Sequence, residues 1–310
     1  MRDNQRGLAG VIDTLSAGYT TVNRYPWIIA IPVLLDLFFW LGHHLTLAPL
    51  VHRSLGLMQV PANLPVEMLQ PYQEYREALA QAGESFNLFS LLVSHFPSIP
   101  SLMAAREGLG PELALSEPWV ALLLSLVLPV VGIWLASLYY VGIGRQVKGG
   151  TEGTGRLWRR VWRSWGRLLG FLLLMLGVIL LFGLPVALLT VLAAAINLAL
   201  IGILGSFVWA AILWAQFYLF FVVDAMVISD VGPLQAIRNS VAVVRFNLRS
   251  ALGLVVLAYV IMLGMPIVWD AVAQGPFGTI AAVLGNAYIT TGLAAASMIY
   301  YRDRIEKLSS

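Results

Sequence analysis

Residues 168–189 read LLGFLLLMLGVILLFGLPVALL, a run of 22 residues without a charged side chain. A helix of about 20 apolar residues is long enough to cross the hydrocarbon core of a bilayer. Directly before this run, residues 155–167 read GRLWRRVWRSWGR, which is rich in arginine and tryptophan. The two stretches together predict a membrane-spanning helix that is preceded by a basic, aromatic segment at the membrane surface.

The whole chain has the composition of an integral membrane protein. Hydrophobic residues make up 59% of its 310 residues and charged residues only 11%, whereas a soluble domain carries about 25% charged residues. The chain contains no cysteine, which excludes disulfides, cysteine-ligated metal sites and thiol nucleophiles. The basic residues flank apolar runs instead of forming a soluble basic face, so nucleic acid is not a predicted partner.

Six apolar runs predict an all-α integral membrane fold with about six transmembrane helices. The predicted spans are residues 25–47, 119–143, 168–189, 198–223, 251–269 and 277–300. The third and fourth spans are predicted to form a hairpin over residues 168–223, with its turn near Asn197, and the fifth and sixth a second hairpin over 251–300. The segments outside the membrane are then 1–24, 48–118, 144–167, 224–250 and 301–310.

The distribution of basic residues predicts the orientation of these spans. Of the 19 lysines and arginines, three lie in segment 48–118 and the other sixteen lie in the segments on the opposite side. Basic residues are enriched on the cytoplasmic side of membrane proteins. We therefore predict a multi-pass protein of a bacterial-type plasma (inner) membrane with both termini in the cytoplasm. Segment 48–118, which is acidic, is expected to form a helical cap on the outer side.

Two of the cytoplasmic segments, 144–167 and 224–250, are predicted to be amphipathic helices that lie at the membrane interface. In both, arginines recur at helical spacing beside an apolar stripe. Such helices place aromatic and aliphatic side chains in the acyl boundary and guanidinium groups on anionic phosphates. Anionic membrane lipid is thus the predicted partner. The candidate headgroup ligands are Arg156, Arg160, Arg163 and Arg167 in the first helix, and Arg238, Arg245 and Arg249 in the second.

Both amphipathic segments are followed by two apolar spans, with FGLP at residues 182–185 and LGMP at residues 263–266. This pattern indicates a duplicated unit of one interfacial helix and two spans. The alternative is that a polytopic protein has simply placed basic linkers on its cytoplasmic side.

The second amphipathic segment also carries the pattern A-x-R-x-S-x-x-x-x-R-x-N, formed by Ala236, Arg238, Ser240, Arg245 and Asn247. It resembles the membrane domain of the glycerophosphoryl diester phosphodiesterase type and related uncharacterised bacterial six-helix families. The resemblance covers residues 230–259. It implies a fold type and a role in the membrane, and no catalytic residue, because the soluble phosphodiesterase barrel of some members has no counterpart in this sequence.

Four polar residues inside predicted spans are candidates for intramembrane function: Asp36, Gln216, Asn286 and Thr290. Asp36 is expected near the midplane of the first span, where a charge is costly and often functional. One hypothesis is a neutral acid that holds helices together, and the other is a proton-relay or ligand-binding acid. Asn286 and Thr290 lie one turn apart and are expected to pack between helices.

The sequence contains no phosphate-binding loop with lysine and no nucleophile motif. We therefore predict a non-enzymatic membrane protein without a cofactor or metal site, with a scaffold or accessory role that engages anionic lipid in envelope or lipid homeostasis. A protein partner is left open. The alternative is a permease, or a permease subunit, for an apolar or amphiphilic solute, with Asp36 and Asn286 along its path.

Overall fold

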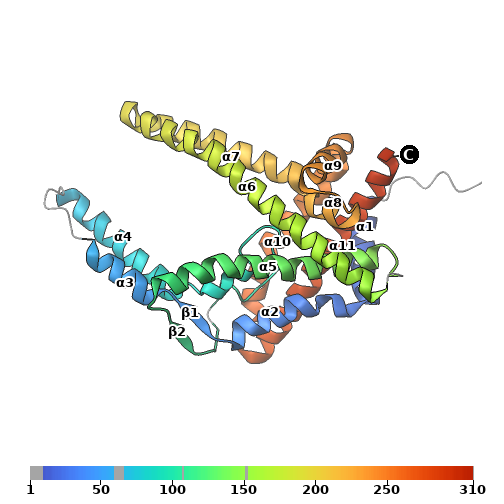
Figure 1. Cartoon of the computed structure of the whole chain (residues 1–310), viewed down its shortest axis with the longest axis horizontal. Coiled ribbons are helices and arrows are strands. Elements are labelled where there is room, and N and C mark those ends of the chain that lie inside the picture. The colour runs from blue at the N-terminus through green and yellow to red at the C-terminus, as the bar shows by residue number, and fades with distance from the viewer. Residues whose placement is uncertain (1–9, 59–65, 107, 151–152, 310) are drawn as a thin grey trace, which may run out of the picture. The chain divides into compact units, whose positions relative to one another are not determined.

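A computed structural model describes residues 10–58, 66–106, 108–150 and 153–309 (Figure 1). Apart from two three-residue strands and two short 3-10 helices, the regular structure of this part is α-helical, which confirms the predicted fold class. Five helical segments are long and apolar enough to cross a membrane, and a broken pair at residues 11–41 makes a sixth if it is taken as one span. The five are Pro118–Val147, Gly155–Ala194, Ala199–Ile228, Leu248–Val272 and Gly275–Leu308.

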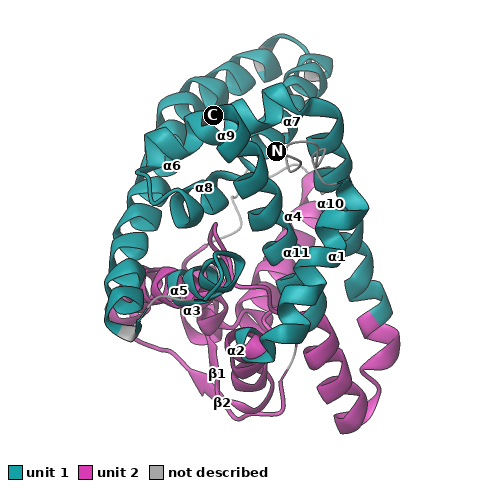
Figure 2. Ribbon diagram, turned by 90° about the vertical axis from the view of Figure 1, so that its right-hand side faces the viewer, with its two compact units in different colours: residues 1–28, 137–268, 288–310 teal, residues 29–136, 269–287 magenta. Residues whose placement is uncertain are grey.

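The chain divides into two compact units, which Figure 2 colours separately. Unit 1 comprises Met1–Ile28, Ser137–Val268 and Tyr288–Ser310, and unit 2 comprises Ile29–Ala136 and Trp269–Ala287. Helices α5 (Pro118–Val147), α10 (Leu248–Val272) and α11 (Gly275–Ser309) contribute residues to both.

The predicted first span is not one helix over residues 25–47. The structure has α1 (Val11–Arg24), a 3-10 turn η1 (Pro26–Ile29) and α2 (Ala30–Leu41). Tyr25, at φ −133° and ψ 65°, breaks the helix between α1 and η1. Pro26 explains the break, because a proline disfavours helical backbone at the residue before it and cannot donate a backbone hydrogen bond.

The segment between α2 and α5 in unit 2 has a small core of its own. It contains α3 (Ala48–Leu57), α4 (Val66–Ser85) and η2 (Leu88–Leu92). Strand β1 (His44–Thr46) pairs in parallel with β2 (Glu112–Ala114), with His44 opposite Glu112. Leu88, Ile99 and Leu102 are buried. The described part of the predicted cap thus contains two α-helices and a 3-10 helix, and α4 continues through Pro71.

Unit 1 contains a long hairpin of α6 (Thr154–Ile196) and α7 (Leu198–Leu219), which lie side by side (Figure 1). The helices separate at Asn197, whose side chain accepts a hydrogen bond from the backbone N–H of Ala199 at 2.9 Å. The predicted turn at Asn197 thus coincides with the break between the helices. With 43 residues, α6 extends about 65 Å, roughly twice the thickness of a hydrocarbon core.

The predicted interfacial segment 144–167 is not a separate helix. Its first residues complete α5, and residues 154–167 are the beginning of α6, which continues into the apolar run without a break. The second segment does form a helix of its own. It contains α8 (Val222–Ile228), whose seven residues are all buried, and α9 (Pro233–Phe246), which Asn247 separates from α10.

Candidate functional site

The beginning of α6 packs on α8 and α9 through a buried strip at helical spacing. Val161, Ser164, Leu168 and Phe171 form this strip. The tryptophans lie on another side of the helix, where Trp158 and Trp162 are exposed and their rings meet edge to face at 6.2 Å. The buried strip thus has the tryptophans along one edge. Along its other edge lies the arginine stripe, which consists of Arg156, Arg160, Arg163 and Arg167. The sequence predicts an aromatic face and a basic face on this helix. The buried strip is a third face that it does not predict, and part of the basic face contacts protein.

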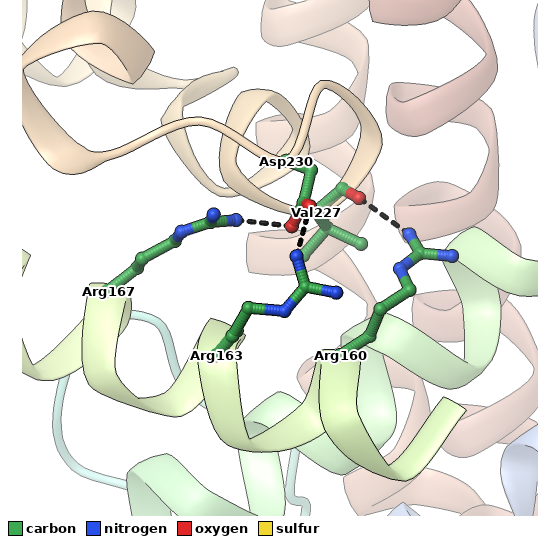
Figure 3. A network of polar contacts seen from close by, with 5 residues as sticks. All are labelled: Arg160, Arg163, Arg167, Val227 and Asp230. Atoms are coloured by element: carbon green, nitrogen blue, oxygen red, sulfur yellow. Dashed lines mark hydrogen bonds and ion pairs between the residues drawn. The ribbon is translucent and has the colours of Figure 1, made fainter. Parts of the chain in front are cut away.

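Asp230 is the counter-charge of this arginine stripe (Figure 3). It follows the end of α8 and has a left-handed backbone with φ 55°, a conformation that aspartate and asparagine adopt more readily than most residues. Nη1 of Arg163 donates to Oδ2 of Asp230 at 2.8 Å, and Nη1 of Arg167 donates to Oδ1. Two arginines from successive turns of α6 thus share one carboxylate.

Arg160 has a different partner. Its side chain is buried, with 8% of its surface exposed, and Nη2 donates to the backbone carbonyl of Val227 at 2.9 Å (Figure 3). Val227 lies in the last turn of α8, where carbonyl groups have no partner within the helix. A cation at a helix C-terminus also interacts favourably with the helix dipole. Arg160 therefore caps α8 and fixes α6 against it.

The other predicted headgroup ligands are exposed. Arg156, Arg238, Arg245 and Arg249 have no hydrogen-bond or ion-pair partner among the described residues. Arg238 and Arg245 are seven residues apart and thus share one face of α9. That face also carries Leu234, which is 64% exposed.

The buried face of α9 coincides only in part with the apolar stripe that the spacing predicts. That stripe comprises Leu234, Ile237, Val241, Val244 and Leu248. Ala236, Ser240, Val243 and Val244 are buried, whereas Leu234 and Leu248 are exposed. Ser240 explains which face of α9 is buried. Its hydroxyl donates to the carbonyl of Tyr218 at 2.7 Å and accepts from the N–H of Phe221 at 3.2 Å. Leu234 and Leu248 consequently stay exposed, as expected of apolar side chains that face the acyl boundary.

Asp36 binds a turn of the segment that follows α4 in unit 2. Its Oδ1 accepts hydrogen bonds from the N–H groups of Leu102 and Met103 at 2.9 and 3.0 Å, and from the hydroxyl of Ser101. The side chain is fully buried. Buried carboxylates are tolerated when such donors replace water. Its partners are thus a turn some 65 residues further along the chain, and not a polar group of another predicted span.

The remaining intramembrane candidates lie in unlike surroundings. Gln216 is on the exposed face of α7, Asn286 is buried in α11, and Thr290 is half-buried one turn further on. The side chain of Gln216 has no hydrogen-bond partner among the described residues.

Sequence reasoning missed the burial of Asp224. Its position at the end of the fourth predicted span indicates access to headgroup water, yet only 5% of its surface is exposed, and it accepts a hydrogen bond from Ser297 of α11. It lies in α8, which α9 covers. The one local signal was the apolar sequence on both sides of it, VV before and AMVI after.

Unit 1 also has an open recess of about 500 Å³ between α1, α5 and α11. Asp13, Arg302 and Gln146 line it together with hydroxyl side chains of α1. Neither Asp36 nor Asn286, the residues predicted along a permease path, takes part in its lining.

No family model, curated protein or solved structure matches the chain. The residues of the site themselves indicate which ligand it can bind. Guanidinium groups are the side chains best suited to bind phosphate, since they remain charged and offer paired donors. At the beginning of α6 and on α9 they lie next to exposed tryptophan and leucine side chains, which favour the membrane interface.

Proposed function

We propose that this polytopic membrane protein has a non-enzymatic, accessory or scaffold role in which α9 and the start of α6 bind anionic phospholipid. The observation that carries the proposal is the exposed face of α9, where Arg238 and Arg245 lie beside Leu234 without a carboxylate partner among the described residues. An amphipathic face of this kind binds anionic membrane surfaces through both charge and apolar contact.

The magnitude of the charge contribution supports a measurable preference for anionic lipid. Each lysine or arginine near such a surface contributes about 1 kcal/mol. Arg156, Arg249 and the exposed Trp158 add to the same kind of contact. The proposal includes a place in envelope or lipid homeostasis and leaves a protein partner open.

The permease alternative needs Asp36 to face a path for solute. Asp36 instead accepts hydrogen bonds from Ser101, Leu102 and Met103, which occupy its acceptor atoms. These contacts favour a structural role for Asp36 over a place on a solute path.

The test measures lipid binding to the full-length protein purified in an uncharged detergent. Native mass spectrometry counts bound phosphatidylglycerol against phosphatidylcholine with the same acyl chains. We expect the double variant Arg238→Gln/Arg245→Gln to lose affinity for phosphatidylglycerol on the order of thirtyfold, because two contacts of about 1 kcal/mol each are removed. Binding of phosphatidylcholine should change little.

The matched control is Arg53→Gln, which removes an exposed arginine of α3 that has no partner among the described residues. It should leave phosphatidylglycerol binding as in the wild type. Equal affinities of the wild type and the α9 double variant for phosphatidylglycerol, with both proteins folded, would contradict the proposed function.

A further inference from the structure

The cluster in Figure 3 carries an excess of positive charge. Arg163 and Arg167 share one carboxylate, that of Asp230, and Arg160 beside them donates to the carbonyl of Val227. The cluster is also open to solvent, since the exposed fractions of the side chains are 48% for Arg163, 22% for Arg167 and 41% for Asp230. It is therefore an accessible place in which an anion could take the position of the carboxylate.

The geometry of the pair suits a phosphate group. Arg163 and Arg167 each direct Nη1 at a different oxygen of Asp230. Two non-bridging oxygens of a phosphate can accept from two guanidinium groups in the same manner, and arginine recognises carboxylate and phosphate through the same donors. The carboxylate of Asp230 thus occupies a position that a phosphate group would fit.

The contact with Asp230 is of a kind that a ligand can replace. Solvent-exposed ion pairs contribute little net stability, because water and salt compete for both partners. Arg160, by contrast, is buried on the carbonyl of Val227 and keeps α6 in place whether or not Asp230 is engaged.

The sequence on both sides places the pair at headgroup depth. Arg167 is the last charged residue before an uncharged stretch that extends from Leu168 to Val223. On the other side, Trp158 and Trp162 are exposed, as expected of rings at a membrane interface. Phosphate groups of the lipid are the anions that concentrate at this depth.

We propose that Arg163 and Arg167 form a phosphate-binding pair for a phospholipid headgroup, and that Asp230 occupies the pair as an internal competitor. The inference rests on the proposed function, since it adds a second lipid-binding site, on α6, to the lipid-binding face of α9. The ligand chemistry is a phosphate group, which a lipid or free phosphate can supply.

The test uses full-length protein in uncharged detergent and titrates phosphatidylglycerol or inorganic phosphate, with native mass spectrometry and thermal stabilisation as readouts. Asp230→Asn removes the competing charge and is expected to raise the affinity for phosphatidylglycerol three- to tenfold. Asp230→Gly is a second variant, because glycine adopts the left-handed backbone without cost. Both should fold.

A matched control is Asp303→Asn, which removes the carboxylate that pairs with Arg302 and should not raise the affinity. In the Asp230→Asn background, Arg163→Gln/Arg167→Gln should abolish the gain. An unchanged affinity in both Asp230 variants, or a gain that survives loss of the two arginines, would overturn the inference. An equal gain with inorganic phosphate would support the pair and assign it to free phosphate.

The outcomes separate this inference from the proposed function. If Arg238→Gln/Arg245→Gln weakens binding while the Asp230 variants do not strengthen it, the lipid-binding face of α9 stands and the phosphate-binding pair fails. If the Asp230 variants strengthen binding while the α9 variant has no effect, the pair stands and the role of α9 fails.

Discussion

The carboxylate of Asp36 shows how a single buried acid can serve as a structural acceptor. It accepts from the N–H groups of Leu102 and Met103, so one side chain satisfies two consecutive backbone donors of this turn. The hydroxyl of Ser101 in turn accepts from the N–H of Ala104 at 3.1 Å. Asp36 therefore connects α2 to the last part of the segment before β2.

Replacing Asp36 by alanine should destabilise unit 2 and loosen this turn. The change leaves the buried N–H groups of Leu102 and Met103 without a partner, at a cost of about 1–3 kcal/mol for each buried group. We expect a lower thermal unfolding midpoint in detergent and faster proteolysis within residues 93–106. Glu84→Gln is the control, since Glu84 pairs with His52 at the exposed surface. Wild-type stability of Asp36→Ala would show that the turn does not depend on the carboxylate.

Asp36 and Asp230 also mark the limit of prediction at this scale. The sequence identifies Asp36 as an acid in an apolar stretch and Arg163 and Arg167 as one stripe of a helix, because both are local patterns. Their partners lie more than 60 residues away. Packing between elements determines which turn binds Asp36 and which carboxylate pairs with the two arginines. Local periodicity does not contain that information.

At the scale of elements, small residues decide how closely α1 approaches α11. A Cβ atom on Gly18 would lie 2.5 Å from the carbonyl oxygen of Gly292 and 2.7 Å from Cβ of Ala296. Next to this contact, the rings of Tyr19 and Tyr288 stack at 5.6 Å. Close approach of backbones at small residues is a common means of helix association in membranes.

Gly18→Ala should therefore push α1 away from α11. The added methyl group meets backbone atoms that cannot rotate aside, and overpacking of this kind costs about 1–3 kcal/mol. We expect a lower thermal unfolding midpoint of the purified protein. Gly177→Ala in α6 is the matched control, because a Cβ atom there meets open space and alanine favours a helix. Equal midpoints for the two variants would contradict this account of the α1–α11 contact.

Elements were predictable where one period persists over many residues. The apolar runs predict the long helices and the break at Asn197, and these follow from hydropathy and length. The break at Tyr25 depends on the single residue Pro26. The mean hydropathy of residues 25–47 predicts a span but does not register one proline within it. Conversely, the change from an arginine-rich to an apolar composition at Leu168 suggests a boundary, yet nothing in the backbone chemistry of the residues there ends a helix, and α6 continues through it.

At the scale of the whole molecule, the orientation in the membrane stays a prediction that one experiment can decide. The chain has no cysteine, so single cysteines can be introduced without removing native ones. Ala78 of α4 and Gln235 of α9 are both exposed. If the basic segments face the cytoplasm, a membrane-impermeant maleimide should label Ala78→Cys in intact cells and label Gln235→Cys only after lysis. The reverse pattern would invert the predicted orientation.

The order of residues along the α6–α7 hairpin has a consequence for how the chain is made. No charged residue is synthesised between Leu168 and Val223. Both helices and the turn at Asn197 can therefore insert laterally into the bilayer without moving a charge through lipid. Asp230 is synthesised only after that hairpin. While the hairpin enters the bilayer, Arg163 and Arg167 therefore cannot yet pair with Asp230, and their guanidinium groups are open to other anions until the residues after α8 have been made.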